Sequence, residues 1–278
     1  IMLFSMVFIM YPKAQVSANR IQELLECKPI IVSPESGVTE TKEQGLVEFE
    51  HVTFTYPDGE EPVLRDISFT AKKGEMVAFI GSTGSGKSTL INLIPRFYDV
   101  TEGSVKVNGV DVREYDLKAL RSKIGFIPQK TRLFTGTIAN NIRFGKKHAT
   151  SKEVEHSTKV AQAYSFIKRK AKQFEEPISE GGANMSGGQK QRLSIARAIV
   201  RKPEVYIFDD SFSALDFKTD ATLRAKLKEE TTDAVVLVVA QRIGSIIEAD
   251  QIIVLNEGEV VGSGKPVSYT HLRAHETE

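Results

Sequence analysis

The chain has 278 residues, 41% of them hydrophobic, which is enough for one large α/β domain or two small ones with a core. Its 37 basic and 36 acidic side chains nearly cancel, so charge gives no reason to expect a general nucleic-acid-binding protein. The single cysteine, Cys27, excludes an internal disulfide framework and is typical of a reducing compartment.

The chain opens with the apolar run IMLFSMVFIM at residues 1–10. That run is too short to cross a bilayer, whose core needs roughly 20 helical residues. Neither a basic segment nor a cleavage site accompanies it, so a signal peptide is not indicated. Helical periodicity continues through 11–28 and stops at Pro29. We interpret residues 1–28 as a helical extension, the end of a transmembrane domain; an ordinary buried helix is the alternative.

Residues 29–45 are rich in Pro, Ser, Thr, Gly and charged side chains, which indicates a linker. A folded domain is expected over residues 46–266. The run VSYTHL at 267–272 resembles the translation of a sequencing adapter. We therefore expect residues 267–278 to be a cloning scar that takes no part in the fold.

The domain begins with alternating apolar residues over 46–56, which predicts strands with one buried face, and a turn follows at Pro57 to Gly59. Continuous apolar runs, typical of strands buried on both faces, follow at 76–80, 205–208, 235–239 and 252–255. They alternate with helical patterns. The expected fold is therefore α/β, with a mostly parallel sheet flanked by helices.

A glycine-rich loop, GSTGSGKST at 81–89, lies between the apolar strand 76–80 and the helical pattern TLINLIPRFY. Its glycines allow the backbone to wrap round phosphates, and its lysine and serine match a nucleotide site. We expect Lys87 to reach the β- and γ-phosphates of ATP and Ser88 to ligate Mg²⁺. The expected cofactor-binding residues here are Gly81, Ser82, Thr83, Gly84, Ser85, Gly86, Lys87, Ser88 and Thr89.

The apolar strand VYIFD ends in Asp209. A carboxylate at the carboxyl end of a buried strand lies where α/β sheets bind ligands, so Asp209 is the candidate second anchor for Mg²⁺, through water. Together with the loop at 81–89, it indicates a P-loop nucleotide hydrolase.

A second phosphate-binding device precedes Asp209: Ser186, Gly187, Gly188 and Gln189 open the helical segment KQRLSIARAIV. One nucleotide has no evident need of both devices, so this one is expected to serve a nucleotide held by another subunit. Here the chain resembles the ABC ATPases, whose signature is Leu-Ser-Gly-Gly-Gln, with Met185 in place of the leucine. The resemblance implies a RecA-like P-loop NTPase core with an antiparallel β-subdomain and an α-helical signature subdomain. It also implies that two cassettes enclose two ATPs.

Other positions match the family's pattern. The resemblance implies that Tyr56 stacks on adenine, that Gln129 contacts Mg²⁺ and the attacking water, and that SALD at 213–216 crosses the dimer interface. Residues 134–142, FTGTIANNI, resemble the segment of exporter cassettes that docks on the membrane domain. Importer cassettes are usually separate chains, so a cassette fused behind a membrane domain favours export.

Two positions depart from the pattern. The residue after Asp209 is usually Glu, which polarises the attacking water; here it is Asp210, whose carboxylate stops roughly 1.5 Å short. After the strand 235–239 the family has His at the γ-phosphate; here Gln241 stands, which cannot carry a proton or a positive charge. Both changes affect positions that the family uses to hydrolyse ATP. They resemble the degenerate subunit of heterodimeric ABC exporters.

The expected partners are a second, non-identical ABC half-transporter with Glu and His intact, and the transmembrane domain of the same protein; no nucleic acid is expected. The cassette would lie on the cytoplasmic face of a membrane. Three alternatives stay open. They are an active homodimeric exporter that tolerates Asp210, a soluble ABC ATPase of DNA repair or translation, and a purely regulatory nucleotide-binding subunit.

Overall fold

The computed structural model describes residues 2–240, 246 and 248–266. The chain divides into two compact units, Ile1–Val32 and Ser33–Glu278. The predicted linker 29–45 therefore falls across their division, and the predicted scar at 267–278 lies outside the described residues.

The first unit contains one long helix, α1 (Met2–Glu26). It joins the apolar run and the periodic segment of the sequence into one element that ends just before Pro29. Pro12 lies inside it and removes one backbone donor. Across the described residues, we find no helix whose length and apolar character would suffice to span a membrane.

An antiparallel sheet opens the second unit, with strand order β2-β1-β4-β5. Val47, Phe49, Val52 and Phe54 are buried in one strand, which confirms the half-buried strand predicted from the alternation. In the predicted turn, the Gly59 N–H donates to the Tyr56 carbonyl (2.9 Å). The strands of this sheet are β1 (Leu46–Phe54), β2 (Leu64–Lys72), β4 (Glu102–Val107) and β5 (Val110–Asp111).

A six-stranded sheet forms the centre of the unit, in the order β12-β11-β3-β10-β9-β6. Its strands are parallel except β12, which runs antiparallel to β11. Every residue of β9 and β10 is buried, as the continuous apolar runs predict. The strands are β3 (Met76–Ile80), β6 (Ile124–Ile127), β9 (Val205–Asp209), β10 (Val235–Val239), β11 (Gln251–Asn256) and β12 (Glu259–Gly264).

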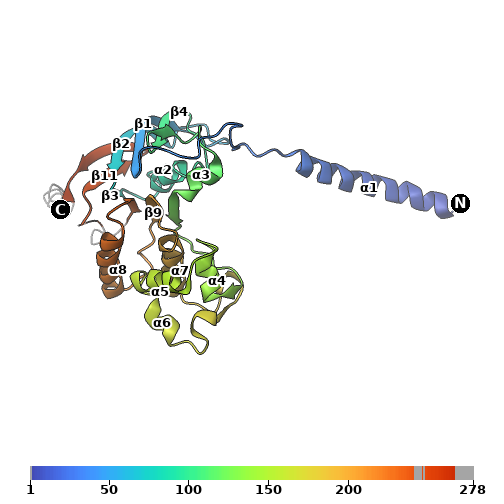
Figure 1. Cartoon of the computed structure of the whole chain (residues 1–278). Helices are drawn as coiled ribbons and strands as arrows, with labels where there is room; N and C mark the ends of the chain where they lie inside the picture. The colour runs from blue at the N-terminus through green and yellow to red at the C-terminus, as the bar shows by residue number, and fades with distance from the viewer. Residues whose placement is uncertain (1, 241–245, 247, 267–278) are drawn as a thin grey trace, which may run out of the picture. The chain divides into compact units, whose positions relative to one another are not determined.

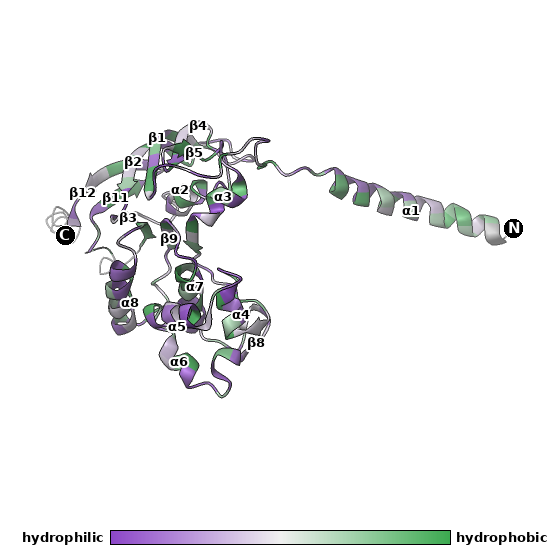
Figure 2. Ribbon diagram, viewed as in Figure 1, coloured by the Kyte–Doolittle hydropathy of each residue, from purple (hydrophilic) through white to green (hydrophobic). Residues whose placement is uncertain are grey.

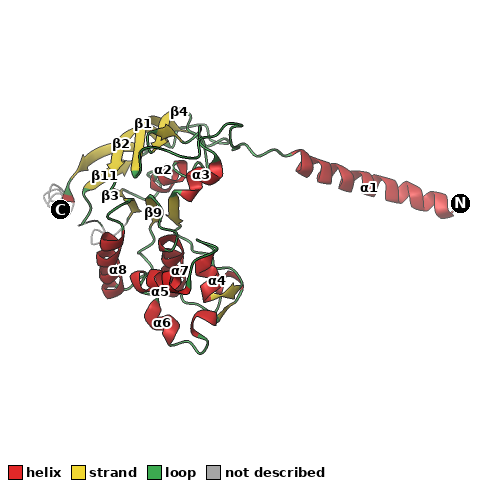
Figure 3. Ribbon diagram, viewed as in Figure 1, coloured by secondary structure: helices red, strands yellow, loops and turns green. Residues whose placement is uncertain are grey.

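Helices surround this sheet, and Figure 3 shows α4 to α7 grouped together, apart from the long strands. The helix after the glycine-rich loop, α2 (Lys87–Leu93), is shorter than its sequence pattern indicated because Pro95 cannot donate a backbone hydrogen bond. The other helices are α3 (Leu117–Ser122), α4 (Ile138–Arg143), α5 (Ser151–Val160), α6 (Tyr164–Lys168), α7 (Gly187–Ile199) and α8 (Phe217–Glu230), with short 3₁₀ turns η1 (Gln173–Glu175) and η2 (Glu180–Gly182). A small two-stranded antiparallel sheet is formed by β7 (Gly136–Thr137) and β8 (Pro177–Ile178).

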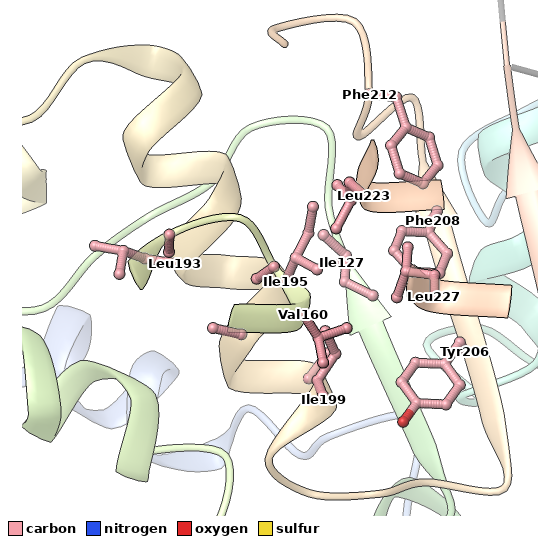
Figure 4. Close-up of a cluster of buried hydrophobic side chains, with 14 of the residues drawn as sticks. Ile127, Val160, Leu193, Ile195, Ile199, Tyr206, Phe208, Phe212, Leu223 and Leu227 are labelled. Carbon is pink, nitrogen blue, oxygen red and sulfur yellow. The ribbon is translucent and has the colours of Figure 1, made fainter. Parts of the chain in front are cut away.

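The central sheet separates two hydrophobic cores, and β9 contributes to both. Tyr206 and Phe208 pack with residues of α7 and α8, the core drawn in Figure 4. Val205 and Ile207, which alternate with them, pack toward α2 and the antiparallel sheet. The strands around β9 are accordingly green in Figure 2, the colour of hydrophobic residues. The predicted α/β fold, with its P-loop core, antiparallel β-subdomain and helical subdomain, is confirmed.

Ile207 offers a test of this architecture, since it is fully buried in the middle of β9. Ile207→Ala should lower the free energy of unfolding by about 2–5 kcal/mol, and Ile207→Val by about 0.5–1.5 kcal/mol, because each leaves a cavity. Urea unfolding with unchanged m-values measures both. Val261→Ala, on exposed β12, is the control and should change stability by less than about 0.5 kcal/mol. Equal losses of stability at Ile207 and Val261 would contradict the burial of Ile207 in the central sheet.

Candidate functional site

The glycine-rich loop follows β3 and leads directly into α2 (Figure 1). Gly81, Gly84 and Gly86 have φ values of 149°, 86° and 93°, in the region that favours glycine. A β-carbon on Gly81 would collide with the Leu255 carbonyl, whereas one on Gly84 would meet open space. The loop is therefore packed tightly at its start and open in its middle, where its backbone can approach a ligand.

Lys87 fixes the shape of this loop. Its Nζ donates to the carbonyl oxygens of Gly81 (2.9 Å) and Ser82 (2.6 Å) and to Ser85 Oγ (3.0 Å). The residue is only 8% exposed. Burial lowers the pKa of Lys87, while the nearby carboxylates of Asp209 and Asp210 act in the opposite direction. A buried ammonium group thus stands at the centre of the loop.

Ser88 and Asp209 come together from separate elements. The Ser88 hydroxyl at the start of α2 donates to Asp209 Oδ1 at the end of β9 (2.9 Å). Burial raises the pKa of the Asp209 carboxyl, and repulsion from Asp210 adds to this, while the Ser88 hydrogen bond and Lys87 oppose it. A hydroxyl beside a carboxylate is an oxygen donor set suited to Mg²⁺, which a nucleotide's phosphates would complete. The residues present therefore fit the ion.

Gln129 and Asp210 meet at the same place. Gln129 Nε2 donates to Asp210 Oδ2 (3.1 Å). Asp210 has φ 46°, an unusual value for a residue with a side chain. Its N–H donates to the Val239 carbonyl (3.0 Å), and its own carbonyl accepts from Ser213 Oγ (2.8 Å). These polar contacts together hold Asp210 in this conformation. The predicted residue Gln241 lies outside the described residues.

These groups surround an open cavity of about 230 Å³. It is lined by Val63, Thr83, Gly84, Gly86, Lys87, Ser88, Thr89, Gln129, Asp209, Asp210 and Val239. Val63 and Val239 are cavity residues that the sequence does not predict. Both side chains are apolar, so nothing in the sequence marks them as ligand-binding residues. They line the cavity because the fold places them beside the loop.

Tyr56 lies at the edge of this site and is not among the residues that line the cavity. Its hydroxyl shares a hydrogen bond with Thr89 Oγ1 (2.9 Å). Its ring makes edge-to-face contacts with Phe54 (centroids 4.8 Å apart) and Tyr98 (5.2 Å). Tyr56 is thus fixed beside the start of α2, next to the phosphate loop.

The second glycine motif stands apart from the cavity and starts α7. Ser186 Oγ accepts from the Gln189 N–H (3.3 Å) and Gln189 Oε1 accepts from the Ser186 N–H (3.2 Å), a reciprocal capping box. A β-carbon on Gly187 would meet nothing, but one on Gly188 would lie 3.1 Å from the Ala214 carbonyl. None of residues 186–189 lines this cavity, so the structure does not bring them together with the loop at 81–89.

Comparison with known proteins gives a consistent result. The sequence profile described as ABC transporter matches residues 64–213. An uncharacterised ABC transporter ATP-binding protein of Mycobacterium tuberculosis is 45% identical over 273 residues, covering 95% of this chain and 46% of that protein. A putative multidrug export ATP-binding/permease protein of Staphylococcus aureus is 41% identical, covering 82% of this chain and 41% of that protein.

Among solved structures, a bacterial Atm1-family ABC exporter with ATP bound superposes with a TM-score of 0.89 at 28% identity, covering 98% of this chain and 49% of that chain. The chain spans about half the length of the relatives that it matches. The profile match extends from β2 to the residues just after Asp209 and Asp210, so it contains the phosphate loop, the second glycine motif and the acidic pair. The chain therefore belongs to the ABC transporter family and carries its ATP-binding domain.

Proposed function

We propose that the chain is the ATP-binding half of an ABC exporter, which binds Mg·ATP to drive export across a membrane. One observation carries the proposal: Lys87, Ser88 and Asp209 converge on one cavity from the loop, α2 and β9. The relatives support export, since one is called a multidrug export ATP-binding/permease protein and the similar structure is an exporter. This favours an exporter over a soluble ATPase of DNA repair or translation.

Each residue has a distinct task in this proposal. Lys87 exchanges its contacts with the loop carbonyls for the β- and γ-phosphate oxygens, where its charge offsets theirs. Ser88 and Asp209 hold Mg²⁺. The ion, when bound, neutralises charge on the phosphates. Tyr56 presents its ring to adenine, and the backbone of residues 81–86 donates to the phosphates.

The exposed turn at 186–189 supports a head-to-tail dimer. It opens a helix of thirteen residues, and the N-terminal end of a helix attracts phosphate. Because it stands away from the chain's own cavity, we assign it to the nucleotide of a second cassette. The SALD segment at 213–216 contacts this turn through Ala214 and would lie between the two sites.

We further propose that the chain's own site hydrolyses ATP slowly and that the partner is a non-identical half-transporter with intact Glu and His. The Asp210 side chain is too short to place its carboxylate where Glu polarises the attacking water, and its Oδ2 accepts a hydrogen bond from Gln129. Gln241 cannot carry the proton or the positive charge that His carries at the γ-phosphate in the family. An active homodimer and a purely regulatory subunit are the alternatives that turnover measurements distinguish.

Lys87→Ala tests ATP binding. The variant should bind Mg·ATP roughly 10- to 100-fold more weakly, because a charge-assisted contact with the phosphates is lost. Isothermal titration calorimetry measures the affinity. Lys226→Ala, an exposed lysine on α8, is the matched control and should bind as the unchanged chain does. Equal affinity in Lys87→Ala and the control would argue against the phosphate site.

Asp210→Glu combined with Gln241→His tests the slow site. In the assembled transporter, hydrolysis at this site should rise by about 10- to 100-fold, since the longer carboxylate reaches the attacking water and His reaches the γ-phosphate. Single-turnover ATPase measurements, with the partner's catalytic Glu replaced by Gln, isolate this site. Asp210→Asn with Gln241→His is the control and should stay slow. An unchanged hydrolysis rate in Asp210→Glu with Gln241→His would contradict the proposal that these two residues make the site slow.

A further inference from the structure

Gln129 is exposed, so close packing does not fix its side chain. Its Nε2 nevertheless donates to Asp210 Oδ2 (3.1 Å), a contact that brings two residues of the nucleotide site together. The place of the Gln129 amide therefore depends on the backbone that carries it, at 127–131. What holds this short segment decides where Gln129 lies.

The regular hydrogen bonding of the central sheet ends just before Gln129. β6 stops at Ile127, and the last residue pair of its ladder with β9 joins Ile127 to Phe208. Beyond that pair, the backbone of the segment needs other hydrogen-bond partners. Side chains from two other parts of the chain provide them.

Ser211 is the first of these partners. It follows Asp210 in the chain and is only 1% exposed. Its hydroxyl donates to the Ile127 carbonyl (2.8 Å) and lies 3.3 Å from the Asp209 carbonyl oxygen. One buried hydroxyl thus ties the end of β6 to the residues that follow β9.

Gln191, on α7, is the second partner, and it contacts the segment both before and after Gln129. Its side-chain Nε2 donates to the Pro128 carbonyl (3.4 Å), and its Oε1 accepts from Thr131 Oγ1 (2.6 Å). Gln191 is only 3% exposed. Because a buried amide loses free energy when a partner is removed, these contacts hold the segment firmly against α7.

We propose that these three side chains, Ser211, Gln191 and Thr131, are positioning residues for the nucleotide site. We call them the Gln129 brace. They fix the backbone at 127–131 and so aim the Gln129 amide at the site. The inference rests on the proposed function, in which the family resemblance assigns Gln129 to Mg²⁺. None of the three lines the nucleotide cavity, so the brace acts through Gln129 and not by contact with the ligand.

A purely structural role for the brace is the alternative, and it makes a different prediction. It would lower the stability of the fold but leave the effect of Mg²⁺ on ATP binding unchanged. A positioning role weakens the contribution of Mg²⁺ to ATP affinity. It spares the affinity for ATP without Mg²⁺, which depends on Lys87 and the loop backbone at 81–86.

Thr131→Val tests the brace, because valine has nearly the same shape but no hydroxyl. Isothermal titration calorimetry of the 278-residue chain measures ATP affinity in Mg²⁺ and in EDTA, and the ratio of the two is the Mg²⁺ gain. Thr131→Val and Gln191→Leu should each reduce the Mg²⁺ gain by about tenfold, as expected for side chains that orient a metal-binding residue. The affinity in EDTA should change by less than about twofold, because the loop still holds the phosphates.

Three comparisons separate positioning from stability. Thr131→Ser restores the hydroxyl and should restore the Mg²⁺ gain. Thr232→Val, at an exposed threonine elsewhere, is the matched control and should keep the full Mg²⁺ gain. In a Gln129→Ala background, Thr131→Val should cause no further loss, because the amide through which the brace acts is already missing.

Three results would overturn the proposal: an unchanged Mg²⁺ gain in Thr131→Val, a full Mg²⁺ gain in Gln129→Ala, or equal effects of Thr131→Val with and without Gln129. Urea unfolding checks that each variant folds, and Ser211→Ala replaces Gln191→Leu if that variant does not. If the unchanged chain bound no Mg·ATP, the proposed function would fail. Normal Mg·ATP binding with any of the three results would refute the brace alone.

Discussion

The parallel pairing of β3, β10 and β9 is the constraint on which the site depends. β10 lies between the other two and pairs residue by residue with both, from Val236 opposite Met76 and Tyr206 to Val239 opposite Phe79 and Asp209. The carboxyl ends of β3 and β9 therefore meet at one edge of the sheet. The phosphate loop leaves one strand there and Asp209 ends the other, although more than a hundred residues separate them in the chain.

Burial then gives these residues their chemical character. Lys87 and Asp209 carry opposite charges in one poorly solvated place. Burial disfavours the charged form of each, and the charge of each opposes that effect on the pKa of the other. The loop carbonyls and the Ser88 hydroxyl keep the lysine and one carboxylate satisfied and correctly aimed. Such preorganisation means that a nucleotide and its cation replace existing contacts and do not have to order a mobile loop.

Much of this was predictable from the sequence, for definite reasons. Apolar runs such as 76–80 and 205–208 indicate doubly buried strands, and the glycine-rich loop has a spacing that few other structures need. Contacts between distant side chains were not predictable. Nothing in the sequence indicates that Gln129 donates to Asp210, that Tyr56 bonds Thr89, or that Val63 lines the cavity. The early end of α2 was also not predicted, because the apolar periodicity of the sequence continues past Pro95.

Close packing between Gly188 and Ala214 links the second glycine motif to the segment beside Asp210. A β-carbon on Gly188 would lie only 3.1 Å from the Ala214 carbonyl oxygen, closer than an ordinary contact, and the neighbouring Ser213 hydroxyl donates to the Asp210 carbonyl. A ligand that displaced the second glycine motif would therefore also displace Ala214, because the two are already in close contact. If two cassettes pair as proposed, movement of this motif would be transmitted through Ala214 and Ser213 to the backbone of Asp210 in the chain's own cavity.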